Sequence, residues 1–303
     1  MNMISESDVL KVLTVNTHSL FPVEGISLTN RERLKVLADR IMQDHVDIVF
    51  LQEVNQPGDD KPVSDDELIS CGYLAGKSLQ SDGRKITHHN FAYQLAHYLY
   101  SKNRKYMWSW NYVHKSYDVM EEGTAIFSAV PTEKALAVHV SAPPYDTTWQ
   151  NRVQTGILIK LAYPVFCFSV HFGWENRPGC EPFLEEWKRF CSFLKLCEKE
   201  MPEACYIVAG DFNNDAVSSS VYKELTQNDG WKDCFIPGIH GGTLVQNQVD
   251  GWGKDHLKER IDWILTKPET EVYKYRYVFD GVHEPVISDH FGVMAELRLK
   301  GAL

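Results

Sequence analysis

The chain has 303 residues and a formal net charge of −10, with 44% hydrophobic and 24% charged residues. This composition is ordinary for a globular protein and is sufficient for one large domain or two small ones. The acidic balance argues against a protein whose main task is to bind DNA or RNA, because such proteins usually present a basic face to the phosphates.

The beginning of the chain and its cysteines predict a cytoplasmic protein. The first residues include Glu6 and Asp8 and lack the apolar core of a secretory signal. No stretch approaches the roughly 18 uncharged apolar residues that a membrane span needs. The seven cysteines contain no Cys-x-x-Cys pair, which favours free thiols in a reducing compartment over a disulfide framework or a zinc site.

Short runs of Val, Leu and Ile predict buried strands, and apolar residues at helical spacing predict helices. In chain order, the expected strands are 9–15, 47–51, 124–127, 136–140, 153–161, 165–170, 206–209, 261–265 and 292–299. A first helix is expected to begin near Thr29, which has capping-box spacing to Glu32. Further helices are expected at 89–100, 182–199 and 217–225.

The order of these elements predicts two packed sheets with helices outside them, because several strands follow one another directly in the middle of the chain. No linker divides the sequence, so we expect a single domain over 1–303. Residues 56–66 are rich in Pro, Gly and Asp and are interpreted as a surface loop. The wider segment, about 56–90, is interpreted as an insertion or a lid.

Polar residues lie repeatedly at the ends of the predicted strands, where loop-borne chemistry is usually built. They are Asn16, His18, Gln52, Glu53, His171, Asp211, Asn213, Asp262, Asp289 and His290. Any one of them is explained equally well as a helix cap or a turn former. Six such clusters in one chain are harder to explain in that way.

At these positions the sequence resembles the endonuclease/exonuclease/phosphatase superfamily, which includes deoxyribonuclease I, abasic-site endonucleases, neutral sphingomyelinases and inositol-polyphosphate 5-phosphatases. The matching strings are LTVN at 13–16, LQEV at 51–54, VHF at 170–172, GDFN at 210–213, RID at 260–262 and SDH at 288–290. They occur in the order of the family. The resemblance implies an α/β (α+β), deoxyribonuclease I-like fold, a four-layer α-β-β-α sandwich of two mixed sheets flanked by helices.

The chemistry of phosphate esters explains the residue types in these strings. The negative charge of the ester repels a nucleophile, so catalysis depends on positioning and charge neutralisation. Mg²⁺ prefers oxygen ligands and needs only one or two protein carboxylates. We expect Glu53 to bind Mg²⁺, with Mn²⁺ as a substitute, and Asn16 and Asp289 to complete or tune the metal site.

Two interpretations of the catalytic base compete. In the first, His290 takes the proton of the water while Asp262 holds its tautomer. In the second, Asp211 activates the water and His290 contacts the phosphoryl oxygens. Asn213 is expected to hydrogen-bond the transition state or orient the nucleophile. His171 is expected to stabilise the phosphate or protonate the leaving oxygen.

The stretch WSWNYVHKSYD at 108–118 suits stacking on sugar rings or on bases. The same aromatic residues equally suit the core of a strand. Charged side chains in and near it are candidates for holding a phosphate, although a solvated charge is the plainer interpretation of each. The substrate-binding candidates are His18, Trp110, Tyr112, Lys115, Arg152 and Trp174.

His18 is a departure from the family pattern, because many relatives place Asp or a small polar residue two positions after the first Asn. Binding to metal, binding to substrate and filling the rim all remain open for His18. The number of metal ions is therefore open as well.

The strings LTVNTH, LQEVNQ and WSWNYVHKSYD resemble a bacterial subgroup of the superfamily that includes maltose 6′-phosphate phosphatases. This resemblance implies a Mg-dependent phosphomonoesterase that hydrolyses a phosphorylated sugar, maltose 6′-phosphate or similar, with a metal-activated water. The alternative is a Mg-dependent endo- or exonuclease acting on DNA, at abasic sites or nonspecifically. A catalytically silent protein would have lost one of Glu53, Asp211, Asp262 or His290, and all four are present. No membrane and no obligate protein partner are expected.

Overall fold

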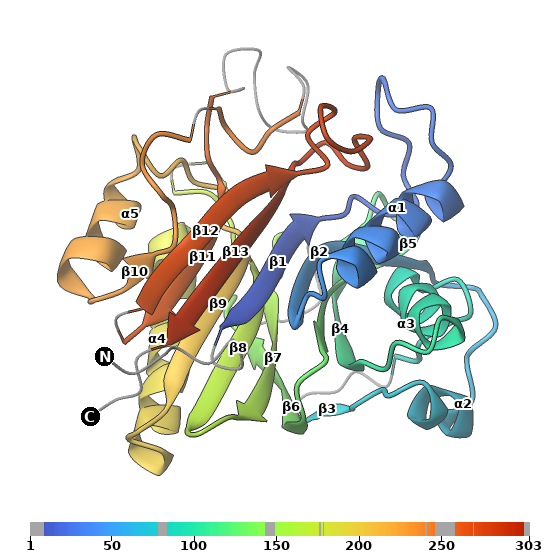
Figure 1. Ribbon diagram of the computed structural model, residues 1–303, viewed down its shortest axis with the longest axis horizontal. Coiled ribbons are helices and arrows are strands. Elements are labelled where there is room, and N and C mark those ends of the chain that lie inside the picture. Colours follow the sequence, from blue (N-terminus) through green and yellow to red (C-terminus); the bar gives the residue numbers. More distant parts are fainter. Residues whose placement is uncertain are drawn as a thin grey trace.

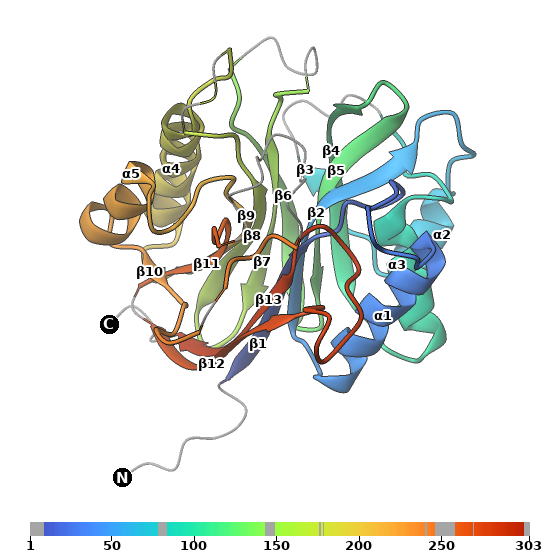
Figure 2. The ribbon, with the colours of Figure 1, turned by 90° about the horizontal axis from the view of Figure 1, so that it is seen from above.

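Two β-sheets pack face to face, and helices cover their outer faces (Figures 1 and 2). The computed structural model describes residues 9–77, 84–142, 149–175, 177, 179–239, 241–245, 258–268 and 270–299. Among these residues, no helix is long and apolar enough to cross a membrane. The layers confirm the predicted α-β-β-α sandwich.

The first sheet has six strands in the order β12-β13-β1-β2-β5-β4. β1 and β2 are parallel, and the other neighbours are antiparallel. The strands are β1 (Leu10–Asn16), β2 (Ile48–Pro57), β4 (Met107–Ser116), β5 (Met120–Ser128), β12 (Thr270–Val278) and β13 (Gly292–Leu299). The carboxyl end of β1, where Asn16 lies, is at the upper edge of this sheet in Figure 1.

The second sheet has seven strands in the order β10-β11-β9-β8-β7-β6-β3. They are β3 (Gly76–Lys77), β6 (Thr132–His139), β7 (Val153–Lys160), β8 (Pro164–His171), β9 (Cys205–Asp211), β10 (Lys232–Asp233) and β11 (Asp262–Lys267). Asp211 on β9 lies opposite His171 on β8 and opposite Asp262 on β11. The register thus brings three of the predicted site residues together on neighbouring strands.

Helices form the two outer layers (Figure 2). One layer holds α1 (Asn30–Gln43), α2 (Asp65–Ser70) and α3 (Phe91–Ser101), and the other holds α4 (Phe183–Glu200) and the short α5 (Ser220–Lys223). The predicted capping box of α1 is confirmed, because the Thr29 hydroxyl accepts from the Glu32 backbone N–H and the Glu32 carboxylate accepts from the Thr29 backbone N–H. Within the helix expected at 217–225, only Ser220–Lys223 is α-helical, and a π-helical turn, Glu224–Asn228, follows it directly.

The aromatic stretch around Trp108 is strand β4, and its large side chains belong to the core. Trp108 and Trp110 are buried among residues of α1 and α3, and Tyr112 packs against the same cluster. The Trp110 indole N–H donates to the Val54 carbonyl oxygen at 2.9 Å. Trp110 and Tyr112 therefore belong to the core between the first sheet and its helices and not to a substrate surface. This agrees with the interpretation that the aromatic residues of this stretch form the core of a strand.

Residues 56–77 and 84–90 are tied to the rest of the domain. β2 continues through Gln56 to Pro57, so the expected loop begins later than predicted. The buried Gln56 side chain donates to the Lys85 carbonyl oxygen and accepts from the Thr87 backbone N–H and the Asn90 amide. Gly76 and Lys77 add an edge strand to the second sheet.

A buried hydrogen-bond bridge fixes the two sheets against each other below the site. The Gln52 amide donates to the Ser169 hydroxyl at 2.9 Å, and Ser169 donates to the Leu51 carbonyl oxygen at 2.9 Å. The Thr14 hydroxyl donates to the Gln52 amide oxygen at 3.3 Å. Because unpaired buried polar groups are costly, these bonds favour one relative placement of β1, β2 and β8.

Replacing Gln52 by Ala should lower the free energy of unfolding by about 1–3 kcal/mol, because the substitution leaves two buried hydroxyl groups without their partner. Urea unfolding followed by fluorescence measures the change. Ala at the exposed Gln227 is the matched control and should leave the midpoint almost unchanged. Equal stability of the two variants would contradict the bridging role of Gln52.

Candidate active site

Asp211 lies at the centre of the predicted polar residues. It ends β9 and is almost fully buried. The preceding Gly210 is required by a close approach, since a Cβ there would lie 1.9 Å from the Val170 carbonyl oxygen. One Asp211 oxygen accepts from the Asn213 backbone N–H at 2.8 Å, and the other faces the His171 and His290 Nε2 atoms at 3.7 and 3.9 Å.

Asn16 joins two carboxylates across the two sheets. Its amide nitrogen donates to Glu53 Oε1 at 2.8 Å and to Asp211 Oδ2 at 3.0 Å. Its amide oxygen accepts from the His18 backbone N–H at 3.1 Å. Both ends of the amide are therefore used, and Asn16 orients Glu53 and Asp211 toward each other.

Glu53 sits at an irregularity of β2, where the pairing with β5 shifts register between Leu51 and Val54. Its φ of +48° is unusual for a residue other than glycine, and such strain is typical of functional sites. The Thr17 hydroxyl and the Ser19 hydroxyl both donate to the Glu53 carbonyl oxygen at 2.9 Å. These bonds hold the bulge and direct the Glu53 side chain toward Asn16.

His18 lies between two predicted metal-binding carboxylates. Its Nδ1 is 2.9 Å from Glu53 Oε2 and 3.9 Å from Asp289 Oδ2. Burial alone would lower the pKa of His18, but the hydrogen bond and charge of Glu53, with the charge of Asp289, raise it to about 9. The imidazole is consequently cationic at neutral pH when no metal competes for these oxygens.

Asp262 and His290 form a buried carboxylate–imidazole pair. His290 Nδ1 is 2.9 Å from Asp262 Oδ2, which leaves Nε2 facing Asp211. Burial lowers the pKa of His290, yet Asp262 and Asp211 outweigh it and raise the pKa well above the ordinary value. The pKa of Asp211 is also raised, by burial and by the charge of Asp262, although His290 opposes the shift.

The donor set fits a divalent cation. Within the described ranges, two groups of three residues have ligand atoms within 4.8 Å of one another: Glu53 with His171 and Asp211, and Asp211 with Asp262 and His290. Carboxylate oxygens are typical ligands of Mg²⁺ and Mn²⁺, and imidazole nitrogens are typical ligands of transition metals. Asp262 Oδ1 is buried and finds no hydrogen-bond partner among the described residues.

The profile of the Endonuclease/Exonuclease/phosphatase family matches residues 13–290. The chain belongs to this family. Family members are metal-dependent hydrolases of phosphoester bonds, so the buried carboxylate–imidazole cluster is the active site expected of one. A comparison with curated proteins gave no match.

Solved structures of the same family share the fold. An endonuclease/exonuclease/phosphatase family protein from Leptotrichia buccalis is 23% identical with a TM-score of 0.76, and the match covers 96% of this chain and 100% of that one. An endonuclease/exonuclease/phosphatase from Beutenbergia cavernae is 17% identical with a TM-score of 0.64, covering 97% and 72%. TDP2 from Caenorhabditis elegans is 17% identical with a TM-score of 0.59, covering 98% and 77%.

In this member of the family a second carboxylate lies behind His171. Glu122 on β5 places Oε1 3.7 Å from His171 Nδ1 and Oε2 3.5 Å from His114 Nε2. Burial alone would raise the pKa of Glu122, but His114 and His171 lower it. No local pattern in the sequence indicates this role, because Glu122 comes from a strand distant in sequence and follows an equally acidic Glu121.

His171 and Asn213 take more limited roles than expected. Burial and the charge of Arg152 hold the pKa of His171 well below its ordinary value, so the imidazole is neutral at neutral pH. A neutral imidazole is a hydrogen-bonding group and a poor proton donor. The Asn213 amide nitrogen donates to the Phe172 carbonyl oxygen at 2.9 Å, and its backbone N–H holds Asp211. Asn213 thus positions Asp211 and the turn after His171.

Two aromatic and two cationic side chains gather beside His171. The Trp174 ring lies 5.9 Å from the Trp149 ring, and the Arg177 guanidinium lies 4.3 Å from the Trp174 ring and 5.0 Å from the Trp149 ring. Arg152 is buried beneath them, 5.9 Å from the Trp174 ring. Of the predicted substrate residues, the structure therefore brings Trp174, Arg152 and His18 to the site. Lys115 is exposed on β4, opposite Glu121.

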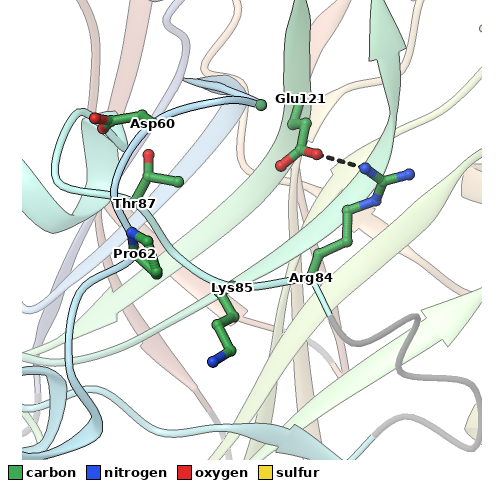
Figure 3. Close-up of a pocket in the computed structure, with 7 residues that line it drawn as sticks. Asp60, Pro62, Arg84, Lys85, Thr87 and Glu121 are labelled. Carbon is green, nitrogen blue, oxygen red and sulfur yellow. Dashed lines mark hydrogen bonds and ion pairs between the residues drawn. The ribbon is translucent and has the colours of Figure 1, made fainter.

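A separate polar pocket of about 360 Å³ opens on the insertion segment (Figure 3). Its lining consists of Gly58, Asp60, Pro62, Arg84, Lys85, Thr87 and Glu121. Arg84 is ion-paired with Glu121 and lies 4.1 Å above the Tyr112 ring. Because side chains alternate along a strand, Glu121 faces this pocket while Glu122 faces His171, so the pocket and the catalytic cluster lie on opposite faces of β5.

Glu186 on α4 holds the loop that follows His171. It is buried, and its carboxylate accepts from the Gly173 backbone N–H at 2.8 Å. Burial raises its pKa to about 7 from the model-peptide value of 4.5, against the opposing charge of Arg152. An acid whose pKa is raised in the folded state stabilises the fold at low pH, and this stability is lost as the pH rises from about 4.5 to about 7.

Replacing Glu186 by Gln should remove that pH-dependent loss while keeping an acceptor for Gly173. The difference in unfolding free energy between the Gln variant and the wild type should increase by about 3 kcal/mol, in favour of the variant, from pH 4 to pH 8. Urea unfolding at several pH values measures it. Gln at Glu185, which pairs with Lys188 on the surface, is the control and should show no such growth. Parallel curves for the Glu186 variant and the wild type would contradict the raised pKa.

Proposed function

We propose that the protein is a cytoplasmic, metal-dependent phosphomonoesterase that removes phosphate from a phosphorylated sugar such as maltose 6′-phosphate. The observation that carries the proposal is the convergence of Glu53, Asp211 and His290 on one buried site. Trp149, Trp174 and Arg177 form a rim beside this site, and Arg152 is buried beneath the rim. None of the seven cysteines, all of which lie in the described part of the chain, forms a disulfide, which supports a reducing compartment.

Glu53 would hold the divalent cation, Mg²⁺ or Mn²⁺, with Asp289 close to the same His18 nitrogen that faces Glu53. When bound, the cation neutralises charge on the phosphate and lowers the pKa of a water molecule. Asn16 keeps the carboxylates of Glu53 and Asp211 at a fixed separation, because its amide donates to both.

The protonation states favour Asp211 over His290 as the base. His290 is held cationic by Asp262, and a cationic imidazole has no lone pair with which to accept a proton. Asp211 is buried with a raised pKa, which suits a carboxylate that takes a proton from water near neutral pH. His290 then offers its Nε2 proton to a phosphoryl oxygen. This assignment selects the second of the two interpretations drawn from the sequence.

The rim supports a sugar phosphate as substrate. Indole faces such as those of Trp149 and Trp174 suit the apolar face of a sugar ring, and Arg177 beside them suits hydroxyl or phosphate oxygens. His171 lies between Glu122 and Asp211, with Nδ1 3.7 Å from Glu122 Oε1 and Nε2 3.7 Å from Asp211 Oδ2. A net charge of −10 supports a small anionic substrate held by a few residues over a long nucleic acid.

The proposal is tested by phosphate release from maltose 6′-phosphate at fixed Mg²⁺ or Mn²⁺, with and without EDTA, beside a duplex oligonucleotide that carries an abasic site. We expect release from the sugar that EDTA abolishes, and intact DNA. Asn at Asp211 should lower kcat by about 10²- to 10⁴-fold, since it removes the base. DNA cleavage with the sugar phosphate unchanged would overturn the proposal in favour of a nuclease.

The rim has its own prediction. Ala at Trp174 should raise KM for maltose 6′-phosphate by roughly 2- to 10-fold, because an aromatic contact contributes about 0.5–1.5 kcal/mol. KM for glycerol phosphate, which has no ring to stack, should stay unchanged and serves as the control. An equal effect on both substrates would mean that Trp174 supports the fold of the site and does not contact the sugar.

A further inference from the structure

His18 occupies a place where its imidazole faces the metal-binding carboxylates directly. Nδ1 is the ring nitrogen that points inward, 2.9 Å from Glu53 Oε2 and 3.9 Å from Asp289 Oδ2. The side chain is largely buried, with about 16% of its surface exposed. Its backbone N–H is fixed by the Asn16 amide oxygen, and its ring lies against Phe21 at a centroid distance of 5.6 Å.

The separation of His18 Nδ1 and Glu53 Oε2 matches that of adjacent ligands around a small dication. Adjacent ligands at ~2.1 Å from an octahedral metal are ~3.0 Å apart, and opposite ligands are ~4.2 Å apart. The His18–Glu53 separation agrees with adjacent ligands, and the His18–Asp289 separation lies between the two values. A single cation that replaced the Nδ1 proton would therefore meet the imidazole nitrogen and Glu53 with little movement of either side chain.

We propose that His18 Nδ1 is a direct ligand of the divalent cation, so that the centre has mixed nitrogen and oxygen ligands and prefers a first-row transition metal over Mg²⁺. The inference rests on the metal centre of the proposed function and specifies its ligands and its selectivity. Mg²⁺ prefers oxygen ligands only, whereas imidazole strengthens binding of Mn²⁺ and the metals that follow it. A carboxylate in place of His18 would remove this preference.

The test uses the full chain, stripped of metal and reloaded with one equivalent of Mn²⁺. Electron spin-echo envelope modulation detects a ¹⁴N nucleus bonded to Mn²⁺, and the EPR signal of free Mn²⁺ gives dissociation constants, with Mg²⁺ as the competitor. The variants are His18→Asp and the matched control His171→Asn, because His171 is the other imidazole near Glu53. Asp tolerates the left-handed backbone of His18, whose φ is +38°, so the variant is expected to fold.

We expect ¹⁴N modulation in the wild type and in His171→Asn, and its loss in His18→Asp. In His18→Asp the ratio of the Mg²⁺ to the Mn²⁺ dissociation constant should fall by roughly 10- to 100-fold, the size of effect that a lost partner at a metal site produces. Circular dichroism and thermal unfolding of the apo proteins confirm that the variants are folded.

Modulation that survives in His18→Asp, or that disappears only in His171→Asn, would overturn the assignment of His18. So would unchanged selectivity or tighter Mn²⁺ binding in His18→Asp, since an imidazole that merely pairs with Glu53 competes with the metal. Phosphate release by the wild type is measured in parallel with EDTA. Phosphate release that EDTA abolishes would support the proposed function, whichever residue binds the metal. Absence of release would count against the proposed function and not against His18 as a metal ligand.

Discussion

The burial of the Asp211 carboxylate is the constraint on which the rest of the site depends. Removing a charge from water costs several kcal/mol unless other groups compensate for it. Here the compensation comes from both sheets: Asn16 and His290 from the first, and the Asn213 backbone N–H from the second. The site therefore exists only when the sheets pack in one arrangement, which the buried Gln52–Ser169 bridge helps to fix.

Carboxylates are concentrated at the site. Glu53, Asp211 and Asp262 converge, and one Asp262 oxygen is buried without a hydrogen-bond partner among the described residues. This donor set suits a divalent cation. Backbone strain at Glu53 and Asn213, both with positive φ, shows that the surrounding structure holds these residues where the local chain would not place them. Such fixed placement is what hydrolysis of a charged ester requires.

Much of the fold was predictable because buried strands and amphipathic helices carry clear local patterns. The runs at 206–209 and 261–265 became neighbouring strands, and the polar residues at their ends became the site. Strand β12 was missed because its charged and aromatic residues lie partly exposed at a sheet edge, where no apolar run is needed. The alternation in β4 places Trp108, Trp110 and Tyr112 on one face of the strand, but it does not indicate whether that face meets the helices or a substrate.

Contacts between distant strands were the part that the sequence could not supply. Glu122 reaches His171 from β5, and Asn16 spans two carboxylates that lie 37 and 195 residues further along the chain. Neither role leaves a local pattern. His18 was visible as a departure from the family, yet only its contact with Glu53 indicates what the departure does.

The central claim is that water, deprotonated by Asp211, attacks phosphorus at a metal site. The most direct measurement is hydrolysis of maltose 6′-phosphate in H₂¹⁸O, with mass analysis of both products. Our account predicts one ¹⁸O atom in each released phosphate, none in the sugar, and no label incorporation above background with Asn at Asp211. Label in the sugar hydroxyl would show cleavage of the C–O bond and would contradict the account.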